Sequence, residues 1–150
     1  MFRLILFILG TAGAVLVAAY LLGLFPYSRG THVAPVRFTL CSRANRTNCV
    51  VDGDTIHYQG TIIRVEGIDT PETHGPKRVS ERALGMRATY RMLELINEAP
   101  FEIVQRGRRD TDKYGLKLRT LERRGRPLGD ILIAEGLARR WDGARHSWCN

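Results

Sequence analysis

The segment CVVDGDTIHYQGTIIRVEGI, residues 49–68, constrains the fold of this chain more than any other stretch. It is rich in β-branched residues, which fit the pleated, half-buried surface of a sheet. Asp52-Gly53 and Gln59-Gly60 interrupt it, and such pairs are typical of tight turns between strands. We therefore predict at least two strands joined by tight turns in this segment.

The residues that follow alternate between loops, helices and strands. The segment IDTPETHGPKRV (68–79) contains two prolines and one glycine among polar residues, which predicts a loop. Ser80 is expected to cap a helix over residues 81–97, where apolar residues recur at helical spacing. Further strands are predicted over residues 101–105 and 116–121.

A shorter helix is predicted in LGDILIAEG (128–136), with Gly136 at its C-terminal cap. The order of elements is thus strands, helix, strands, helix. This order favours a mainly β fold with helices, of the α+β class. Short strands with a crossing helix are typical of a small closed or nearly closed β-barrel.

An uncharged apolar run from Leu4 to Phe25 is long enough to cross a hydrocarbon layer as a helix. Two interpretations remain open for residues 1–27: an uncleaved membrane anchor, or a signal peptide cleaved before Tyr20. Either one predicts an exported protein, periplasmic, secreted or anchored to the inner membrane. We assign residues 28–48 to a linker, 49–142 to the folded domain and 143–150 to a C-terminal tail.

The composition adds two constraints. The formal net charge of +8 favours polyanionic partners such as nucleic acid, anionic lipid or acidic polysaccharide, without choosing among them. Cys41, Cys49 and Cys149 lack the paired spacing of a zinc site. In an exported domain they allow one disulfide and one remaining thiol, and all three pairings stay open.

Two acidic clusters border the predicted strands, at Asp52-Gly53-Asp54-Thr55 and at Asp69-Thr70-Pro71-Glu72. Antiparallel strands are able to bring the two clusters together. Converging carboxylates repel each other unless a cation lies between them, and hard oxygen ligands suit Ca²⁺. Taken singly, each cluster also has the composition of an ordinary turn.

The motifs VVDGDTI, IRVEGIDTPET, TDKYG and LGDILIAEGLA occur in the order and at the spacings typical of the staphylococcal nuclease (thermonuclease) family. The chain resembles this family over roughly residues 49–140. The resemblance implies an OB-fold barrel of five strands and a Ca²⁺-dependent phosphodiesterase, an endonuclease that hydrolyses DNA and RNA. It also implies a nucleic-acid partner, such as single-stranded DNA or RNA.

The resemblance assigns roles to single residues. Asp54 and Asp69 match the carboxylate ligands of Ca²⁺, Thr70 matches the residue that offers its backbone carbonyl, and Asp52 matches an outer acid that holds metal-bound water. Glu72 matches the residue proposed to activate the attacking water, and Arg64 matches a guanidinium that binds the scissile phosphate. Lys113 and Tyr114 match positions that contact a nucleotide phosphate.

One position departs from the family pattern. Leu116 stands where the family carries a second phosphate-binding arginine. Leucine donates no hydrogen bond, so the sequence predicts a nuclease of reduced activity. Lys117 and Arg119 are expected on the opposite face of the strand. A replacement cation therefore requires either a bulge that turns Lys117 inward or Arg108 or Arg109 from the preceding loop.

The departure at Leu116 also supports a different class of protein. A catalytically weak or inactive module that binds nucleic acid or another polyanion is the alternative hypothesis. The stretch GLARRWDGARHSWC (136–149) resembles the ends of exported nuclease-like proteins of rhizobia, including one named for succinoglycan biosynthesis. This resemblance implies a connection with exopolysaccharide synthesis.

Overall fold

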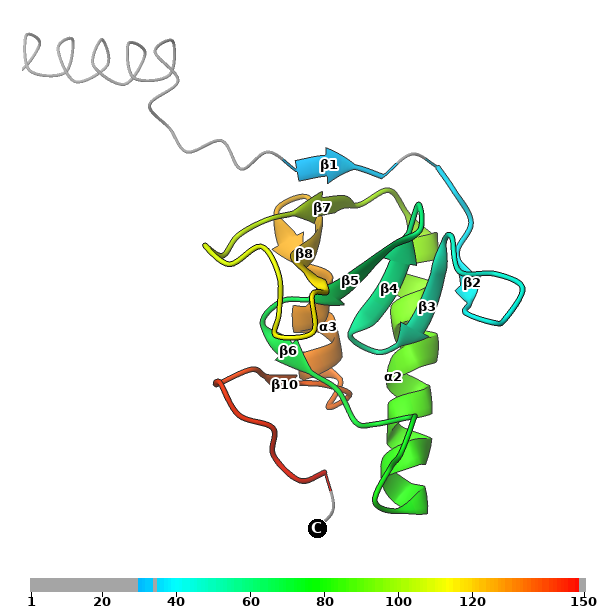
Figure 1. The fold of residues 1–150 in the computed structure, drawn as a ribbon, viewed down its shortest axis with the longest axis vertical. Helices are drawn as coiled ribbons and strands as arrows, with labels where there is room; N and C mark the ends of the chain where they lie inside the picture. Colours follow the sequence, from blue (N-terminus) through cyan, green and yellow to red (C-terminus); the bar gives the residue numbers. More distant parts are fainter. Residues whose placement is uncertain (1–29, 34, 149–150) are drawn as a thin grey trace, which may run out of the picture.

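The computed structural model describes residues 30–33 and 35–148, which form a mixed sheet and two helices (Figure 1). The α+β class predicted from the sequence is confirmed. The predicted signal or anchor region at residues 1–27 lies outside the described residues. Among the residues that are described, no helix is both long and apolar enough to cross a membrane. The elements, in chain order, are β1 (Gly30–His32), β2 (Thr39–Leu40), β3 (Cys49–Asp52), β4 (Thr55–Tyr58), β5 (Thr61–Val65), β6 (Ile68–Asp69), α2 (Val79–Glu98), β7 (Glu102–Val104), β8 (Lys117–Arg123), β9 (Arg126–Pro127), α3 (Leu128–Ala134) and β10 (Arg139–Arg140).

The predicted tight turns join β3, β4 and β5 into an antiparallel meander. Gln59 and Gly60 connect β4 to β5 with positive φ angles of 51° and 79°, which is the backbone of a two-residue hairpin turn. The meander then continues through a parallel pairing of β5 with β8, in which Arg64 lies opposite Leu118. This parallel pairing places the strand of Arg64 beside the strand that follows Leu116.

The strands follow one another in the order β1-β7-β8-β5-β4-β3-β2, and β9 pairs with β8. The path has β1 and β2 at its two ends, so the described strands make no closed ring of hydrogen bonds. A small second ladder joins β6 to β10, with Asp69 opposite Arg139 (Figure 1). It brings the residues after α3 alongside the first residues of the predicted loop.

The segment assigned to a linker, residues 28–48, contributes β1 and β2 to the sheet in its described part. Phe38 is only 1% exposed and packs against the rings of Tyr58 and Phe101. A disulfide joins Cys41 to Cys49, one of the three pairings that the sequence left open. Much of this segment therefore belongs to the folded domain.

Helix α2 packs against β3 and α3, and α3 packs against β8. In α2, Met92 and Leu95 are buried at helical spacing, as the apolar pattern predicts. The predicted cap at Ser80 is wrong: the N-cap is Arg78, whose side chain makes no capping hydrogen bond. Ser80 lies inside the first turn, because the helix begins at Val79.

The predicted end of the second helix is confirmed. Helix α3 ends at Ala134, and Gly136 follows with a φ of 70°. The Gly136 amide donates to the Ile133 carbonyl at 3.0 Å, and the Leu137 amide donates to the Leu132 carbonyl at 2.8 Å. Only glycine adopts this left-handed backbone without strain, so the residue stops the helix and turns the chain toward β10.

Candidate active site

The centre of the site is a guanidinium that lies between two buried carboxylates. Arg64 projects from β5, and its Nη2 lies 3.1 Å from Asp54 Oδ2 and 3.7 Å from Asp69 Oδ1. The side chains of Asp54 and Asp69 are 5% and 6% exposed, whereas that of Arg64 is 20% exposed. The structure thus brings together three residues that the sequence placed in one site.

Asp54 is held by the turn between β3 and β4. Its amide donates a hydrogen bond to Asp52 Oδ1 at 3.2 Å, which fixes the local backbone of the turn. Asp54 Oδ2 in turn accepts a hydrogen bond from the Thr70 amide at 3.2 Å. This bond ties the first acidic cluster to the second. Asp52 therefore has a turn-stabilising role in addition to any role toward a metal.

The electrostatic environment raises the pKa values of both buried carboxyls. For Asp54, burial is the largest cause and repulsion from Asp52 adds to it, so that the pKa rises to about 6 despite the attraction of Arg64. For Asp69, burial also raises the pKa, and a hydrogen bond from Trp148 opposes the rise. A cation placed beside these groups counteracts both shifts, because it favours the ionised carboxylates.

Asp69 Oδ1 is buried and has no hydrogen-bond partner among the described residues. Its charged neighbours are Arg64 Nη2 at 3.7 Å and Arg145 Nε at 3.6 Å. Buried oxygens without a donor are uncommon in proteins and call for an explanation. An oxygen of this kind, next to a second buried carboxylate, is suited to a hard cation.

The possible metal ligands are few. Across residues 30–33 and 35–148, no group of three or more His, Cys, Asp or Glu side chains is gathered closely enough to hold a metal ion. A metal at this site would therefore rely on Asp54, Asp69, backbone carbonyls such as that of Thr70, and water. All of these are oxygen donors, which excludes the ligand set of a structural zinc site.

Glu72 lies at the rim of the site, on the loop between β6 and α2. Its side chain is 29% exposed, and its Oε1 contacts Nη1 of Arg145. The loop approaches α2 at Gly85, where an added Cβ would lie 2.6 Å from the Pro71 carbonyl oxygen. The absence of a side chain at Gly85 thus allows the loop that carries Glu72 to pack on the helix.

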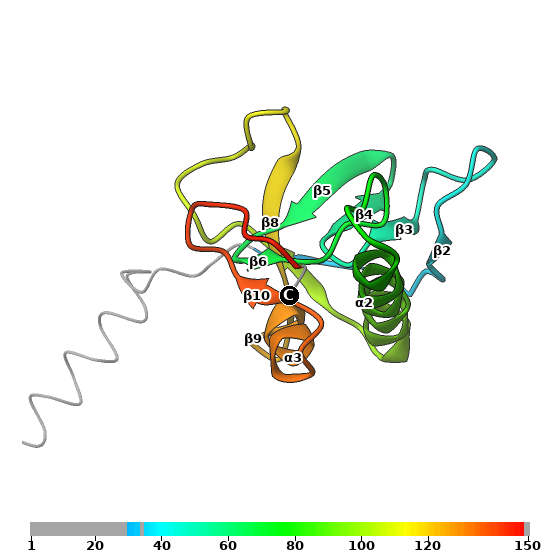
Figure 2. The ribbon, with the colours of Figure 1, turned by 90° about the horizontal axis from the view of Figure 1, so that it is seen from below.

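Arg145 lies at the site although the sequence did not predict it there. It belongs to the segment predicted as a C-terminal tail, whose described residues pass near β6 in the view of Figure 2 and contact Asp69 through Arg145. Trp148 follows it and donates from Nε1 to Asp69 Oδ2 at 3.2 Å. Only the spacing of basic and aromatic residues after β10 distinguishes this stretch, and that pattern does not reveal which carboxylates it meets.

Lys113 and Tyr114 form part of a turn before β8. The Tyr114 amide donates to Asp112 Oδ1 at 2.8 Å, and the Tyr114 ring is 75% exposed with Lys113 Nζ 4.9 Å from its centroid. In the described part of the chain, neither residue makes a polar contact with Asp54, Asp69 or Glu72. Their role toward a nucleotide stays a prediction.

Among the described residues, the cations near Leu116 make no contact with the buried carboxylates. Lys117 and Arg119 both pair with Asp110, which confirms that they share one face of β8. Leu118, between them, is 7% exposed and faces the interior. Arg108 and Arg109 are exposed, and no contact joins either of them to the buried carboxylates within the described residues.

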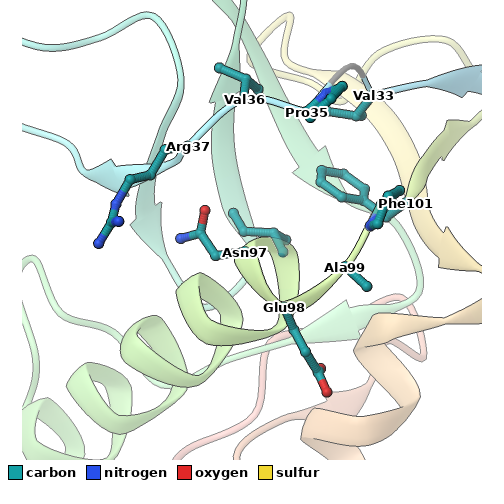
Figure 3. Close-up of a pocket in the computed structure, with 10 residues that line it drawn as sticks. Val33, Pro35, Val36, Arg37, Asn97, Glu98, Ala99 and Phe101 are labelled. Atoms are coloured by element: carbon teal, nitrogen blue, oxygen red, sulfur yellow. The ribbon is translucent and has the colours of Figure 1, made fainter.

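A separate pocket of about 480 Å³ lies at the C-terminal end of α2, lined by residue 33, residues 35–37 and residues 96–101 (Figure 3). Asn97 fixes this region through two hydrogen bonds with the Phe38 backbone, at 2.9 and 3.1 Å. The pocket contains none of the predicted site residues. Its construction indicates a structural role for Asn97.

The fold and the site define an α+β protein with two buried carboxylates paired through one guanidinium. Comparison with known proteins supports a nuclease-like chain: it is 38% identical over 94 residues to the SPbeta prophage-derived endonuclease YokF of Bacillus subtilis. The match covers 59% of this chain and 31% of YokF, so the chain spans less than a third of that relative's length. No protein-family model matches the chain.

Proposed function

We propose that this protein is a Ca²⁺-dependent phosphodiesterase, an endonuclease that hydrolyses DNA or RNA. The observation that carries the proposal is the position of Arg64 between the buried carboxylates of Asp54 and Asp69, with Glu72 at the rim. The name of the relative YokF and the thermonuclease-like motifs support the same reaction class.

We also propose that the sheet corresponds to the nuclease-type OB-fold barrel. The five strands concerned are β3, β4, β5, β7 and β8. Their pairings, antiparallel within the meander, parallel between β5 and β8 and antiparallel between β7 and β8, support this correspondence. In this arrangement Arg64 and the two buried carboxylates lie on elements joined by short connections.

The donor set fits Ca²⁺, with Asp54 and Asp69 as carboxylate ligands and Thr70 as the carbonyl ligand. Asp69 Oδ1 supports this assignment, because it is buried without a hydrogen bond from the described residues. When bound, the ion would polarise a phosphoryl oxygen and help to neutralise its charge. Asp52, close enough to Asp54 to raise its pKa, would act from outside this ligand set.

The side chains around these ligands have distinct tasks. Glu72 accepts a proton from water as the water oxygen bonds to phosphorus, while one phosphorus–oxygen ester bond breaks and its oxygen is protonated by solvent. Arg64 binds the phosphate through the planar guanidinium and neutralises the additional charge of the transition state. Its partial burial strengthens this interaction relative to one in water.

The proposal is tested by incubating the purified protein with denatured DNA in Ca²⁺ or in chelator. We expect cleavage that requires Ca²⁺ and falls by about 100-fold or more in Arg64→Ala and Glu72→Gln variants. Arg64→Lys should recover little of the cleavage rate that Arg64→Ala loses, because lysine lacks the planar pair of donors. Cleavage that persists unchanged in Glu72→Gln would rule out the assigned base.

A polyanion-binding module is the second candidate function, and Leu116 is the observation that favours it. The Leu116 side chain supplies no cation to the site, and the net charge of +8 still attracts nucleic acid. This candidate predicts salt-sensitive binding of DNA without cleavage in Ca²⁺. The same assay thus separates the two functions.

We further propose that the protein is exported, either secreted, periplasmic or anchored through residues 4–25. The Cys41–Cys49 disulfide supports an oxidising compartment, in which such bonds persist. A connection with exopolysaccharide synthesis rests only on the resemblance of residues 136–149. Cell fractionation and size analysis of the mature chain test the location and the cleavage of the N-terminal region.

A further inference from the structure

The segment 142–148 places the guanidinium of Arg145 beside Asp69 and Glu72. Asp142 begins a turn in which its carboxylate accepts a hydrogen bond from the Ala144 amide at 3.1 Å and pairs with His146 at 2.8 Å. The turn directs Arg145 toward the site, where Nη1 contacts Glu72 Oε1 and Nε lies 3.6 Å from Asp69 Oδ1. One cation thus meets both the proposed base and a proposed metal ligand.

Independent contacts hold this segment in place. Arg139, which lies opposite Asp69 in the β6–β10 ladder, donates from Nη1 to the Ser147 carbonyl at 2.8 Å. Its guanidinium carbon also lies 3.9 Å from the centre of the Trp148 ring, within the range of a cation–π interaction. Trp148 then bonds to Asp69 at 3.2 Å. The position of Arg145 therefore does not depend on its own ion pairs alone.

The site has a chemical need for a second cation. Arg64 is shared between two buried carboxylates, and the strand that begins after Leu116 offers no other guanidinium to it. Lys117 and Arg119 are paired with Asp110. A phosphodiester transition state carries more negative charge than the ester itself, so a donor aimed at the phosphate accelerates cleavage.

We propose that Arg145 binds the scissile phosphate and supplies the guanidinium that Leu116 cannot. This inference rests on the proposed phosphodiesterase function. The Arg145 side chain is 52% exposed, in contrast to 20% for Arg64, and it lines a pocket of about 380 Å³ with Thr70, Glu72 and Trp148. A guanidinium has five N–H donors, so its contacts with the carboxylates leave donors for a phosphate.

The test compares Arg145→Ala, Arg145→Lys and Arg140→Ala in the full chain, with single-stranded DNA and Ca²⁺. Arg140 is the matched control, because it lies in the same part of the chain and pairs with Asp130, away from the carboxylate site. We expect Arg145→Ala to lower kcat by about 100-fold and Arg140→Ala to change it less than about twofold. Lysine at position 145 should recover only part of the loss.

A double variant distinguishes the loss of the Arg145 guanidinium from a general disturbance of the 142–148 segment. Leu116→Arg introduced together with Arg145→Ala should restore cleavage by at least about tenfold over Arg145→Ala alone, because it returns a guanidinium from the strand side. A rate for Arg145→Ala equal to that of the parent would overturn the proposal. A faster rate would also overturn it, since the segment would then obstruct the site.

Binding provides a readout that does not need turnover. Thymidine 5′-monophosphate in Ca²⁺, titrated by calorimetry, should bind about tenfold more weakly to Arg145→Ala than to Arg140→Ala. If the parent binds the nucleotide but cleaves no DNA, the proposed catalytic function fails while this comparison still decides the role of Arg145. Equal affinities for the two variants would refute phosphate binding by Arg145.

Discussion

The indole nitrogen of Trp148 donates a hydrogen bond to Asp69 Oδ2 at 3.2 Å. A hydrogen bond to an ionised carboxylate stabilises the ionised form and lowers its pKa. It opposes the effect of burial, which raises the pKa of Asp69. Trp148, in the segment after β10, thus favours the ionised form of Asp69 on β6.

Replacement of Trp148 by phenylalanine should raise the pKa of the Asp69 carboxyl further. Phenylalanine keeps an aromatic ring beside Arg139 but has no N–H donor. The pKa is measured by carbon NMR titration of the Asp69 carboxyl in chelator. Trp141→Phe is the control, because Trp141 is 40% exposed and joins the fold through its backbone amide, which donates to the Gly67 carbonyl at 3.0 Å. An unchanged Asp69 pKa in Trp148→Phe would contradict the assigned hydrogen bond.

In chelator, the contribution of Asp54 to the free energy of unfolding should fall as the pH rises from about 4 to about 7. The pKa of Asp54 rises from 3.8 to about 6 on folding, so the folded protein binds the proton more tightly than the unfolded chain. The stabilising effect of protonated Asp54 is complete below pH 3.8 and is lost as pH passes through 6. At 1.36 kcal/mol per pKa unit the difference is about 3 kcal/mol.

Urea unfolding at several pH values measures this contribution. Other groups titrate in the same range, so the comparison is between the parent and Asp54→Asn. The variant should show a flatter pH dependence because residue 54 no longer titrates. Ca²⁺ should remove most of the loss in the parent at neutral pH, since it binds the ionised carboxylates of the folded protein. If the unfolding free energies of the parent and of Asp54→Asn changed with pH in parallel, Asp54 would be excluded as the source of the pH dependence.

Gly85→Ala should destabilise the protein although it lies inside α2. Alanine normally stabilises a helix interior by about 0.5–1 kcal/mol over glycine. Here the new Cβ would lie 2.6 Å from the Pro71 carbonyl and 3.0 Å from Thr73 Cγ2. Moving these atoms costs about 1–3 kcal/mol and shifts the adjoining Glu72, so cleavage should slow as well.

Unfolding free energies of Gly85→Ala and Ala83→Gly check this prediction. Ala83 is exposed in the same helix and reports the intrinsic difference between alanine and glycine there. The prediction would be contradicted if Gly85→Ala were more stable than the parent by about as much as Ala83→Gly is less stable. The loop would then leave room for a Cβ at position 85.

Removal of the Cys41–Cys49 disulfide should lower stability while cleavage stays unchanged. The cysteines are separated by eight positions, and closing so short a loop reduces the entropy of the unfolded chain. The expected loss is about 2.5 kcal/mol for Cys41→Ala combined with Cys49→Ala. Chemical unfolding with and without reductant measures it. The double variant should not respond to reductant, whereas the parent should.

Much of the fold followed from local rules in the sequence. Gln59-Gly60 predicted the turn between β4 and β5, and Gly136 predicted the end of α3. Both features require positive φ angles at these residues, and glycine adopts such angles readily. The cap at Ser80 was wrong because α2 begins at Val79, before Ser80, and the chain ahead of the helix is held instead by Glu81, which accepts a hydrogen bond from the Lys77 amide at 2.7 Å. Arg78 instead occupies the N-cap, one residue before Val79.

The candidate site was predictable only where its residues follow one another closely. Arg64, Asp69 and Glu72 lie within one short stretch, and the turn at Asp52 brings Asp54 to them. Arg145 was not predictable, since its position depends on the pairing of β6 with β10 and on the turn after Asp142. A contact between residues so far apart in sequence leaves no local pattern.

The contacts of the 142–148 segment also have a consequence for how the protein tolerates shortening. A chain that ends after β10 would keep every strand of the main sheet and both helices. It would lose the contacts of Arg145 with Asp69 and Glu72 and the hydrogen bond from Trp148 to Asp69. Proteolytic trimming of this end would therefore change the site while it leaves the fold in place.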